Sequence, residues 1–293
     1  MKKLAYLLLP LISIALGGCA NNQSSNTLKL ATTFAPVYDF VSRIVKDKAE
    51  IINIVGDNEP HEFSPSDPKT SSFCERADVL FAYGEGLDSW SKRMNENKYF
   101  EITSNVEFIQ SGNATDPHAY LSLRDSKIML KNIKNKMIEV DPKNAEFYNA
   151  NYAKAIEEFE ALDDRYNSEL ALDKLNSRYI VTSHEAFAYL ARDYSLVQKG
   201  IADIADHEPS ASKIAQIKKF IMDNNIKYIF LEELDEKGHV ETIVSELKKD
   251  NYEVSYEVLS AYEGVSQTSY ANGETYLKAM EDNLEILKRC LTK

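Results

Sequence analysis

One uninterrupted helical stretch near the middle of the chain constrains its fold more than any other feature. Residues 142–170 read PKNAEFYNANYAKAIEEFEALDDRYNSEL, with no glycine and no proline after the first position. Such a helix is more than twice the usual length of about 11–12 residues. We therefore predict one long rigid helix, within residues 141–172, that joins two parts of the molecule.

Strands and helices are predicted to alternate on both sides of this linking helix. Apolar runs typical of buried strands occur at 28–33, 50–55, 78–83, 106–110, 178–182, 196–201, 227–231 and 253–259. Helical patterns occur at 36–46, 126–140, 184–193, 212–224, 240–249 and 275–290. Because repeated strand–helix units form parallel sheets, the sequence predicts an α/β protein with two parallel-sheet lobes, residues 28–140 and 173–293.

The first residues of the chain have the pattern of an export signal. Two lysines precede an apolar run from Leu4 to Leu16, which is too short to span a membrane as a helix. The sequence Leu16-Gly17-Gly18-Cys19 resembles the lipobox of bacterial lipoproteins, whose cysteine is lipidated and becomes the first mature residue. An ordinary cleaved signal that contains a cysteine is the alternative.

We therefore expect a signal peptide at residues 1–18 and a flexible, polar tether at residues 19–27. A lipid such as palmitate on Cys19 would hold the rest of the chain at a membrane surface. The predicted location is extracytoplasmic and lipid-anchored to the bacterial cell membrane.

The charge of the chain bears on its ligands. The formal net charge is −12, and removal of Lys2 and Lys3 with the signal would make it about −14. This charge argues against nucleic acid and is compatible with a cationic ligand. Besides Cys19 only Cys74 and Cys290 remain, without a CxxC pair, so a thiolate zinc site is not expected. These two cysteines could pair, although two free thiols are the favoured interpretation.

Three of the five histidines lie where open α/β sheets bind ligands, beyond the carboxyl ends of strands. His61 lies in the proline-rich loop GDNEPHEFSPSDPK, which follows the second predicted strand. His118 lies in TDPHAY after the strand predicted to end at Gln110, and His184 directly follows the strand RYIVT. Glu263, in SAYEGVS, follows the last predicted strand.

These four residues come from both lobes and could converge in the cleft between them. Three imidazoles and a carboxylate make a tetrahedral zinc site, and nitrogen-rich donors favour Zn²⁺ over Mn²⁺ or Mg²⁺. A single loop histidine is more often a surface residue, and His207 and His239 are the other candidates. The carboxylate could also come from one of four more glutamates that lie near strand ends: Glu59, Glu185, Glu208 and Glu233.

Six segments carry a resemblance to a known family. They are FAPVYDFVSRIV, VGDNEPHEFSPSDP, ATDPHAYLSLRDSKIMLKNI, VTSHEAFAYLARDYSL, ADHEPSASKIAQIKKFI and YLKAMEDNLEILK. In this order they resemble segments of the metal-specific substrate-binding proteins of bacterial ABC transporters, and more closely the zinc-binding lipoprotein members. The resemblance covers nearly the whole mature chain.

The resemblance implies a ligand set. It maps three histidine ligands onto His61, His118 and His184, and a fourth, glutamate ligand of the streptococcal type onto Glu263. Manganese-type members carry glutamate where this chain has His184. Glu59 matches a glutamate that lies near the metal in some zinc members.

This chain also departs from some members of the family. It has no histidine-rich arm between the first two ligands, and we expect no extra C-terminal zinc domain after Lys293. His207 falls where the family usually has no ligand. Metal capture is therefore expected to depend on the cleft site alone.

The predicted function is the zinc-binding component of an ABC importer, a monomer that is not an enzyme and that delivers Zn²⁺ to the permease and its ATPase. A site with four protein ligands has no open position for a reactive water, which suits capture and delivery. The alternatives are a manganese-binding homologue, a surface adhesin, and a three-histidine zinc hydrolase with Glu185 or Glu59 as its base.

Overall fold

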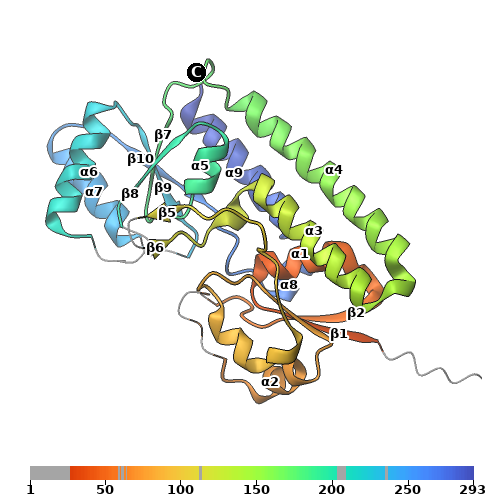
Figure 1. Cartoon of the computed structure of the whole chain (residues 1–293). Coiled ribbons are helices and arrows are strands. Elements are labelled where there is room, and N and C mark those ends of the chain that lie inside the picture. Colours follow the sequence, from red (N-terminus) through yellow and green to blue (C-terminus); the bar gives the residue numbers. More distant parts are fainter. Residues whose placement is uncertain are drawn as a thin grey trace, which may run out of the picture.

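Two parallel sheets, one in each half of the chain, form the framework of the molecule (Figure 1). The computed structural model describes residues 27–58, 60, 63, 65–111, 114–202, 209–234 and 237–293. The predicted signal peptide, Cys19, Glu59, His61 and His207 lie outside these residues. Of the helices in the described ranges, none combines the length and apolar character needed to cross a lipid bilayer.

The first sheet has the strand order β2-β1-β3-β4, with all neighbours parallel. Its strands are β1 (Leu28–Thr32), β2 (Ala49–Asn53), β3 (Val79–Ala82) and β4 (Tyr99–Glu101). The second sheet has the order β10-β9-β7-β8, again parallel. Its strands are β7 (Tyr179–Thr182), β8 (Val197–Gly200), β9 (Tyr228–Glu232) and β10 (Ser255–Leu259). The prediction of two parallel-sheet lobes is confirmed.

Helices cover both sheets and join them. Around the first sheet lie α1 (Ala35–Val45), α2 (Pro68–Glu75) and α3 (Leu123–Val140), and around the second lie α5 (Ala188–Asp193), α6 (Ala211–Asp223) and α7 (Gly238–Lys249). The helices α4 (Ala145–Glu169), α8 (Gln267–Ala271) and α9 (Tyr276–Leu291) complete the described set. Short 3₁₀ turns are η1 (Lys46–Lys48), η2 (Ser89–Met94), η3 (Glu96–Lys98), η4 (Ala119–Leu121) and η5 (Pro142–Asn144).

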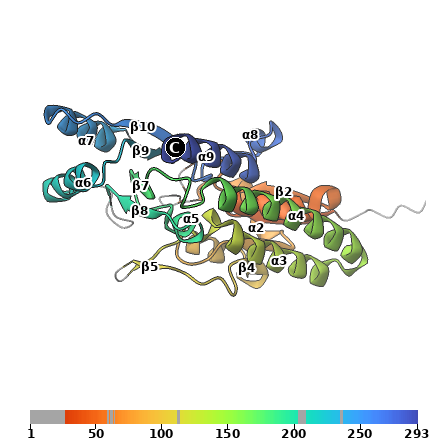
Figure 2. The ribbon, with the colours of Figure 1, turned by 90° about the horizontal axis from the view of Figure 1, so that it is seen from above.

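The long helix α4 is fastened to both lobes, as Figures 1 and 2 show. Near its start, the Asn151 side chain donates to the carbonyl of Ile44 in α1, at 2.9 Å. Near its end, the Arg165 guanidinium binds Glu281 and Glu285 of α9, at 2.6 and 2.7 Å. One apolar core also runs through both lobes and includes buried residues of both sheets and of α1, α3, α4 and α9. These attachments restrict rotation of one lobe against the other.

Polar caps set where several helices begin. The Ser122 hydroxyl accepts from the Asp125 backbone N–H at 3.0 Å and starts α3. Asp67 caps α2 in the same way, and Pro68 occupies the first turn, where a missing N–H costs nothing. The Ser122 cap explains why α3 begins three residues before the start that periodicity predicts.

The predicted strand at 106–110 is wrong. Only Gln110 and Ser111 pair, in β5 (Gln110–Ser111), with the antiparallel β6 (Ala114–Thr115). The preceding residues form an irregular segment whose apolar side chains pack against the main core. The Ile109 N–H donates to the Tyr189 hydroxyl at 2.8 Å instead of joining a sheet. Apolar alternation here reflects packing of a loop rather than strand pairing.

The predicted helix at 184–193 is correct only from Ala188 onward. The carbonyl of His184, which would accept the first bond of a longer helix, instead accepts from the Thr182 hydroxyl at 2.6 Å and from Gln198 at 3.2 Å. His184 therefore lies in a turn and not in a helix. The strand β4 and the helices α2 and α8 were not predicted.

Cys74 and Cys290 are both free thiols, as favoured from the sequence. Cys74 is fully buried, and burial raises its pKa to about 11. Burial likewise raises the pKa of Cys290 to about 11. Both side chains are therefore protonated at neutral pH and act as apolar packing groups.

Candidate metal centre

His118 is held in the interior by the aspartate two residues before it. Its ring is fully buried, and Nδ1 lies 2.7 Å from Oδ1 of Asp116, which also accepts the His118 backbone N–H at 2.9 Å. An Nδ1–H that donates to a carboxylate fixes the ring and makes Nε2 the nitrogen that can ligate a cation. Burial lowers the pKa of His118, although the bond to Asp116 opposes this. The imidazole is therefore neutral at physiological pH, which is the form that binds metal.

His184 has a similar partner in the second lobe. Its Nδ1 lies 2.6 Å from Oε2 of Glu232, the last residue of β9, and both side chains are buried. The Ser183 hydroxyl accepts the Glu232 backbone N–H at 2.9 Å, so the histidine turn and the end of β9 are fastened together. Because β7 and β9 are neighbours in the sheet, the fold brings this pair together across a long sequence separation.

Gly200 gives the turn after His184 the space that it needs. A Cβ on Gly200 would lie 2.3 Å from Cγ of Glu185 and 2.5 Å from the carbonyl oxygen of Ala202. Both distances are far below van der Waals contact. A larger residue at this position must therefore displace the chain next to His184.

Glu263 lies in the turn that follows β10, and its side chain is buried. One carboxylate oxygen, Oε1, accepts a hydrogen bond from the Tyr120 hydroxyl and lies 3.9 Å from Nε2 of His118. Burial and the Glu263 charge raise the pKa of Tyr120 well above its usual value, so this hydroxyl keeps its proton. The Tyr120 hydroxyl thus orients the carboxylate toward His118.

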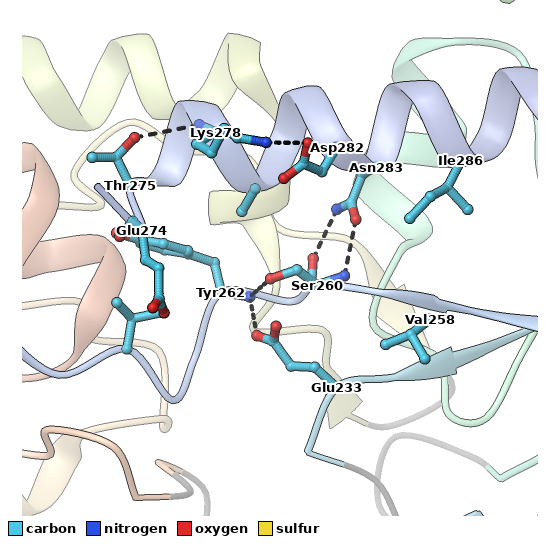
Figure 3. A pocket seen from close by; sticks show the side chains of 12 residues that line it. Glu233, Val258, Ser260, Tyr262, Glu274, Thr275, Lys278, Asp282, Asn283 and Ile286 are labelled. Atoms are coloured by element: carbon cyan, nitrogen blue, oxygen red, sulfur yellow. Dashed lines mark hydrogen bonds and ion pairs between the residues drawn. The ribbon is translucent and has the colours of Figure 1, made fainter. Parts of the chain in front are cut away.

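The turn that carries Glu263 is fixed from the second lobe as well (Figure 3). The Tyr262 N–H donates to Glu233 at 3.0 Å, and Asn283 of α9 bonds both the N–H and the carbonyl of Ser260, at 2.9 and 2.8 Å. A pocket of about 230 Å³ lies between this turn, β10 and α9. Its lining does not include His118, His184 or Glu263, so it is separate from the candidate metal centre.

His118 is the central member of the group. Its ring centroid lies 5.3 Å from that of His184, with the ring planes at 59°, and its Nε2 faces Glu263. In the described residues, no three histidine, cysteine or carboxylate side chains are close enough together to hold a metal ion. Because His61 and Glu59 lie outside these residues, the complete ligand set stays a prediction.

The remaining candidates lie elsewhere or act indirectly. His239 lies in the first turn of α7, and Glu185 faces the N–H of Gly200 at 3.4 Å. Asp116, Glu232 and Tyr120 were not predicted. An aspartate two residues before a histidine and a glutamate at a strand end were visible signals, but the partner of each could not be identified without the strand order.

The metal-free protein should lose stability in acid through His118. Because its pKa is lowered in the folded state, the unfolded chain takes up a proton at this residue first. The free energy of unfolding should therefore fall as pH drops below about 6.5, by up to about 1.4 kcal/mol per pH unit. Urea unfolding with a chelator present, at about pH 7.5 and about pH 5.5, measures this effect. His118→Gln should show a smaller pH dependence, and an equal one would contradict the assignment.

The chain also matches the model of a known protein family. The family "Zinc-uptake complex component A periplasmic", ZnuA, matches residues 30–290. The chain belongs to the ZnuA family. It is thus a member of a family of substrate-binding proteins that serve zinc uptake.

Individual ZnuA relatives match over most of the chain. It is 29% identical over 308 residues to the high-affinity zinc uptake system protein ZnuA of Bacillus subtilis (strain 168), covering 95% of this chain and 94% of the relative. It is 30% identical over 313 residues to the zinc-binding lipoprotein AdcA of Streptococcus pneumoniae serotype 4, covering 99% of this chain. The chain spans only 61% of the length of that relative.

A solved ZnuA-like structure has the same architecture. The crystal structure of the Zn(II)-bound ZnuA-like domain of Streptococcus pneumoniae AdcA superimposes with a TM-score of 0.76 at 29% identity. The match covers 91% of this chain and 100% of that domain. The fold predicted from the sequence is therefore the fold of this family.

Proposed function

We propose that this protein captures Zn²⁺ outside the cytoplasm and delivers it to the permease and ATPase of an ABC importer. The proposed ligands are His61, His118, His184 and Glu263, with Glu59 near the metal. The main support is the approach of His118 and His184, from different lobes, to a centroid distance of 5.3 Å. Each ring has a carboxylate at Nδ1, which is the arrangement that orients metal-binding histidines in proteins.

The donor types favour zinc as the cargo. In the described residues, His118 lies beside His184 and also beside Glu263, and His61 would add a third imidazole. Nitrogen-rich sites suit Zn²⁺ better than Mn²⁺, which prefers more oxygen ligands. The buried carboxylates of Asp116 and Glu232 add negative charge behind the histidines and favour a divalent cation further.

The same donor set supports transport rather than hydrolysis. If Glu263 completes a four-ligand shell, no position remains for the water that a zinc hydrolase activates. Release would then require a local shift that separates His184 from His118, because α4 and the shared core hold the lobes together. We further propose that lipid on Cys19 keeps the single chain close to its permease.

Metal analysis of the mature protein, purified without chelator, tests this function. We expect one zinc per chain and tighter binding of Zn²⁺ than of Mn²⁺ in competition with a chelator. Free Zn²⁺ at about 1,000 times its Kd should raise the free energy of unfolding by about 4 kcal/mol. Preferential stabilisation by Mn²⁺, or no stabilisation by either ion, would contradict the proposal.

A further inference from the structure

A buried aspartate of the first lobe holds both ends of the segment that follows Glu263. Asp39 of α1 is fully buried, and one of its carboxylate oxygens, Oδ2, accepts from the Tyr276 N–H at 2.9 Å. The same oxygen lies 3.2 Å from the Tyr262 hydroxyl, which can also donate to the Glu274 carbonyl at 3.0 Å. The other oxygen accepts from the Arg43 guanidinium. Hydrogen bonds between charged partners, such as this one between Arg43 and Asp39, are stronger than bonds between neutral groups.

The chain between these two anchors also attaches to the first lobe. The Gln267 side chain donates to the carbonyl of Ile51 in β2, the edge strand of the first sheet, at 2.9 Å. The Asn53 side chain donates to the carbonyl of Val265 at 3.0 Å. These bonds cross from the second half of the chain to β2. Although residues 262–276 follow the last strand of the second sheet, they are fastened to the first.

Glu263 follows the first anchor directly, and its carboxylate is in contact with the first lobe too. Its carboxylate accepts from Tyr120 and faces His118, both of which precede the linking helix. Tyr262 has a φ of 58°, in the left-handed region that tyrosine rarely adopts. Such a conformation persists only where its surroundings hold it. Asp39 and the Glu274 carbonyl hold the tyrosine hydroxyl, and Glu233 holds its N–H.

We propose that Asp39 is a positioning residue for Glu263. It fixes the turn at Tyr262 so that the Glu263 carboxylate meets a cation on His118, although Asp39 itself does not touch the metal. The proposed glutamate ligand is thus tied to the first lobe as well as to the second, and the second lobe contributes His184. This inference rests on the proposed function.

Zinc affinity of two substituted proteins tests this role. Asp39→Asn keeps the shape of the side chain but removes its charge, and Tyr262→Phe removes the hydroxyl that lies between Asp39 and the Glu274 carbonyl. We expect Asp39→Asn to weaken Zn²⁺ binding by about tenfold or more, as for groups that support metal ligands, and Tyr262→Phe by a few-fold. Competition with a chromophoric chelator measures the Kd, and urea unfolding of the metal-free proteins measures stability separately.

A matched control separates positioning from a general loss of stability. Asp141 is also a buried aspartate that accepts a tyrosine hydroxyl, that of Tyr148 at 2.7 Å, but it lies at the end of α3. Asp141→Asn should lower stability and leave the zinc Kd unchanged. In a Glu263→Gln background, Asp39→Asn should cause no further loss of affinity, because the group that it positions is already changed.

The outcomes distinguish the two proposals. If Glu263→Gln leaves the zinc Kd unchanged, the proposed ligand set is wrong. If Glu263→Gln weakens binding while Asp39→Asn and Tyr262→Phe behave like Asp141→Asn, the positioning role is overturned. Fully additive losses in the double variant would also overturn it. Should Asp39→Asn not fold, Tyr262→Phe and its combination with Glu263→Gln decide the question in the same way.

Discussion

His184→Ala should weaken Zn²⁺ binding by about a hundredfold or more, because it removes an imidazole ligand and not merely a supporting group. The change also removes the imidazole whose Nδ1 lies 2.6 Å from Oε2 of Glu232, so the buried Glu232 carboxylate loses this contact. Chelator competition measures the effect on the Kd.

The control is His239→Ala, in the first turn of α7, which should leave the Kd unchanged. Equal affinities of the two variants would remove His184 from the site. Wild-type affinity in both would leave the group around His118 without a role in metal binding.

Gly200→Ala should lower the free energy of unfolding by about 2–3 kcal/mol, which is typical of overpacking at a close-packed position. The new methyl group would collide with Glu185 and with the carbonyl oxygen of Ala202, at 2.3 and 2.5 Å. The Glu185 side chain can move aside, but the backbone oxygen cannot do so without shifting the chain. Because Glu185 follows His184, we also expect weaker zinc binding.

Gly238→Ala provides a matched comparison for this substitution. Gly238 begins α7, and a Cβ there would have no heavy atom within 4 Å. Alanine in a helix should leave stability unchanged or raise it by up to about 1 kcal/mol. Urea unfolding of both variants with a chelator present measures the difference. Equal stability of the two would show that the turn at His184 tolerates displacement.

Much of the fold could be predicted because its strands and helices carry strong local signals. The runs around β1, β7 and β9 are short and apolar, and α4 contains neither glycine nor proline. The three-residue strand β4 could not be predicted, because its register comes from pairing with β3 and not from its own pattern. At 106–109 the apolar pattern predicted a strand where the structure has a loop, because a loop that packs on the core also carries apolar side chains.

The sequence alone suggests the candidate ligands of the site, but it does not suggest the residues that orient them. His118, His184 and Glu263 follow predicted strands or loops, and the structure places His118 next to both of the others. The pairing of His184 with Glu232 depends on β7 and β9 being neighbours, which the sequence does not specify. The bond from Tyr120 to Glu263 likewise joins distant parts of the chain.

The apolar core that continues through both lobes has a consequence for how the molecule is built. Each half has a smaller apolar core of its own, but the largest core is shared, because α9, from the end of the chain, contributes to the same cluster as α1, from its beginning. Separating the halves at the linking helix would expose the apolar residues of the shared core on each half. We therefore expect the two lobes to unfold together, and an ancestral or engineered half-protein would need a substitute for the missing part of the shared core.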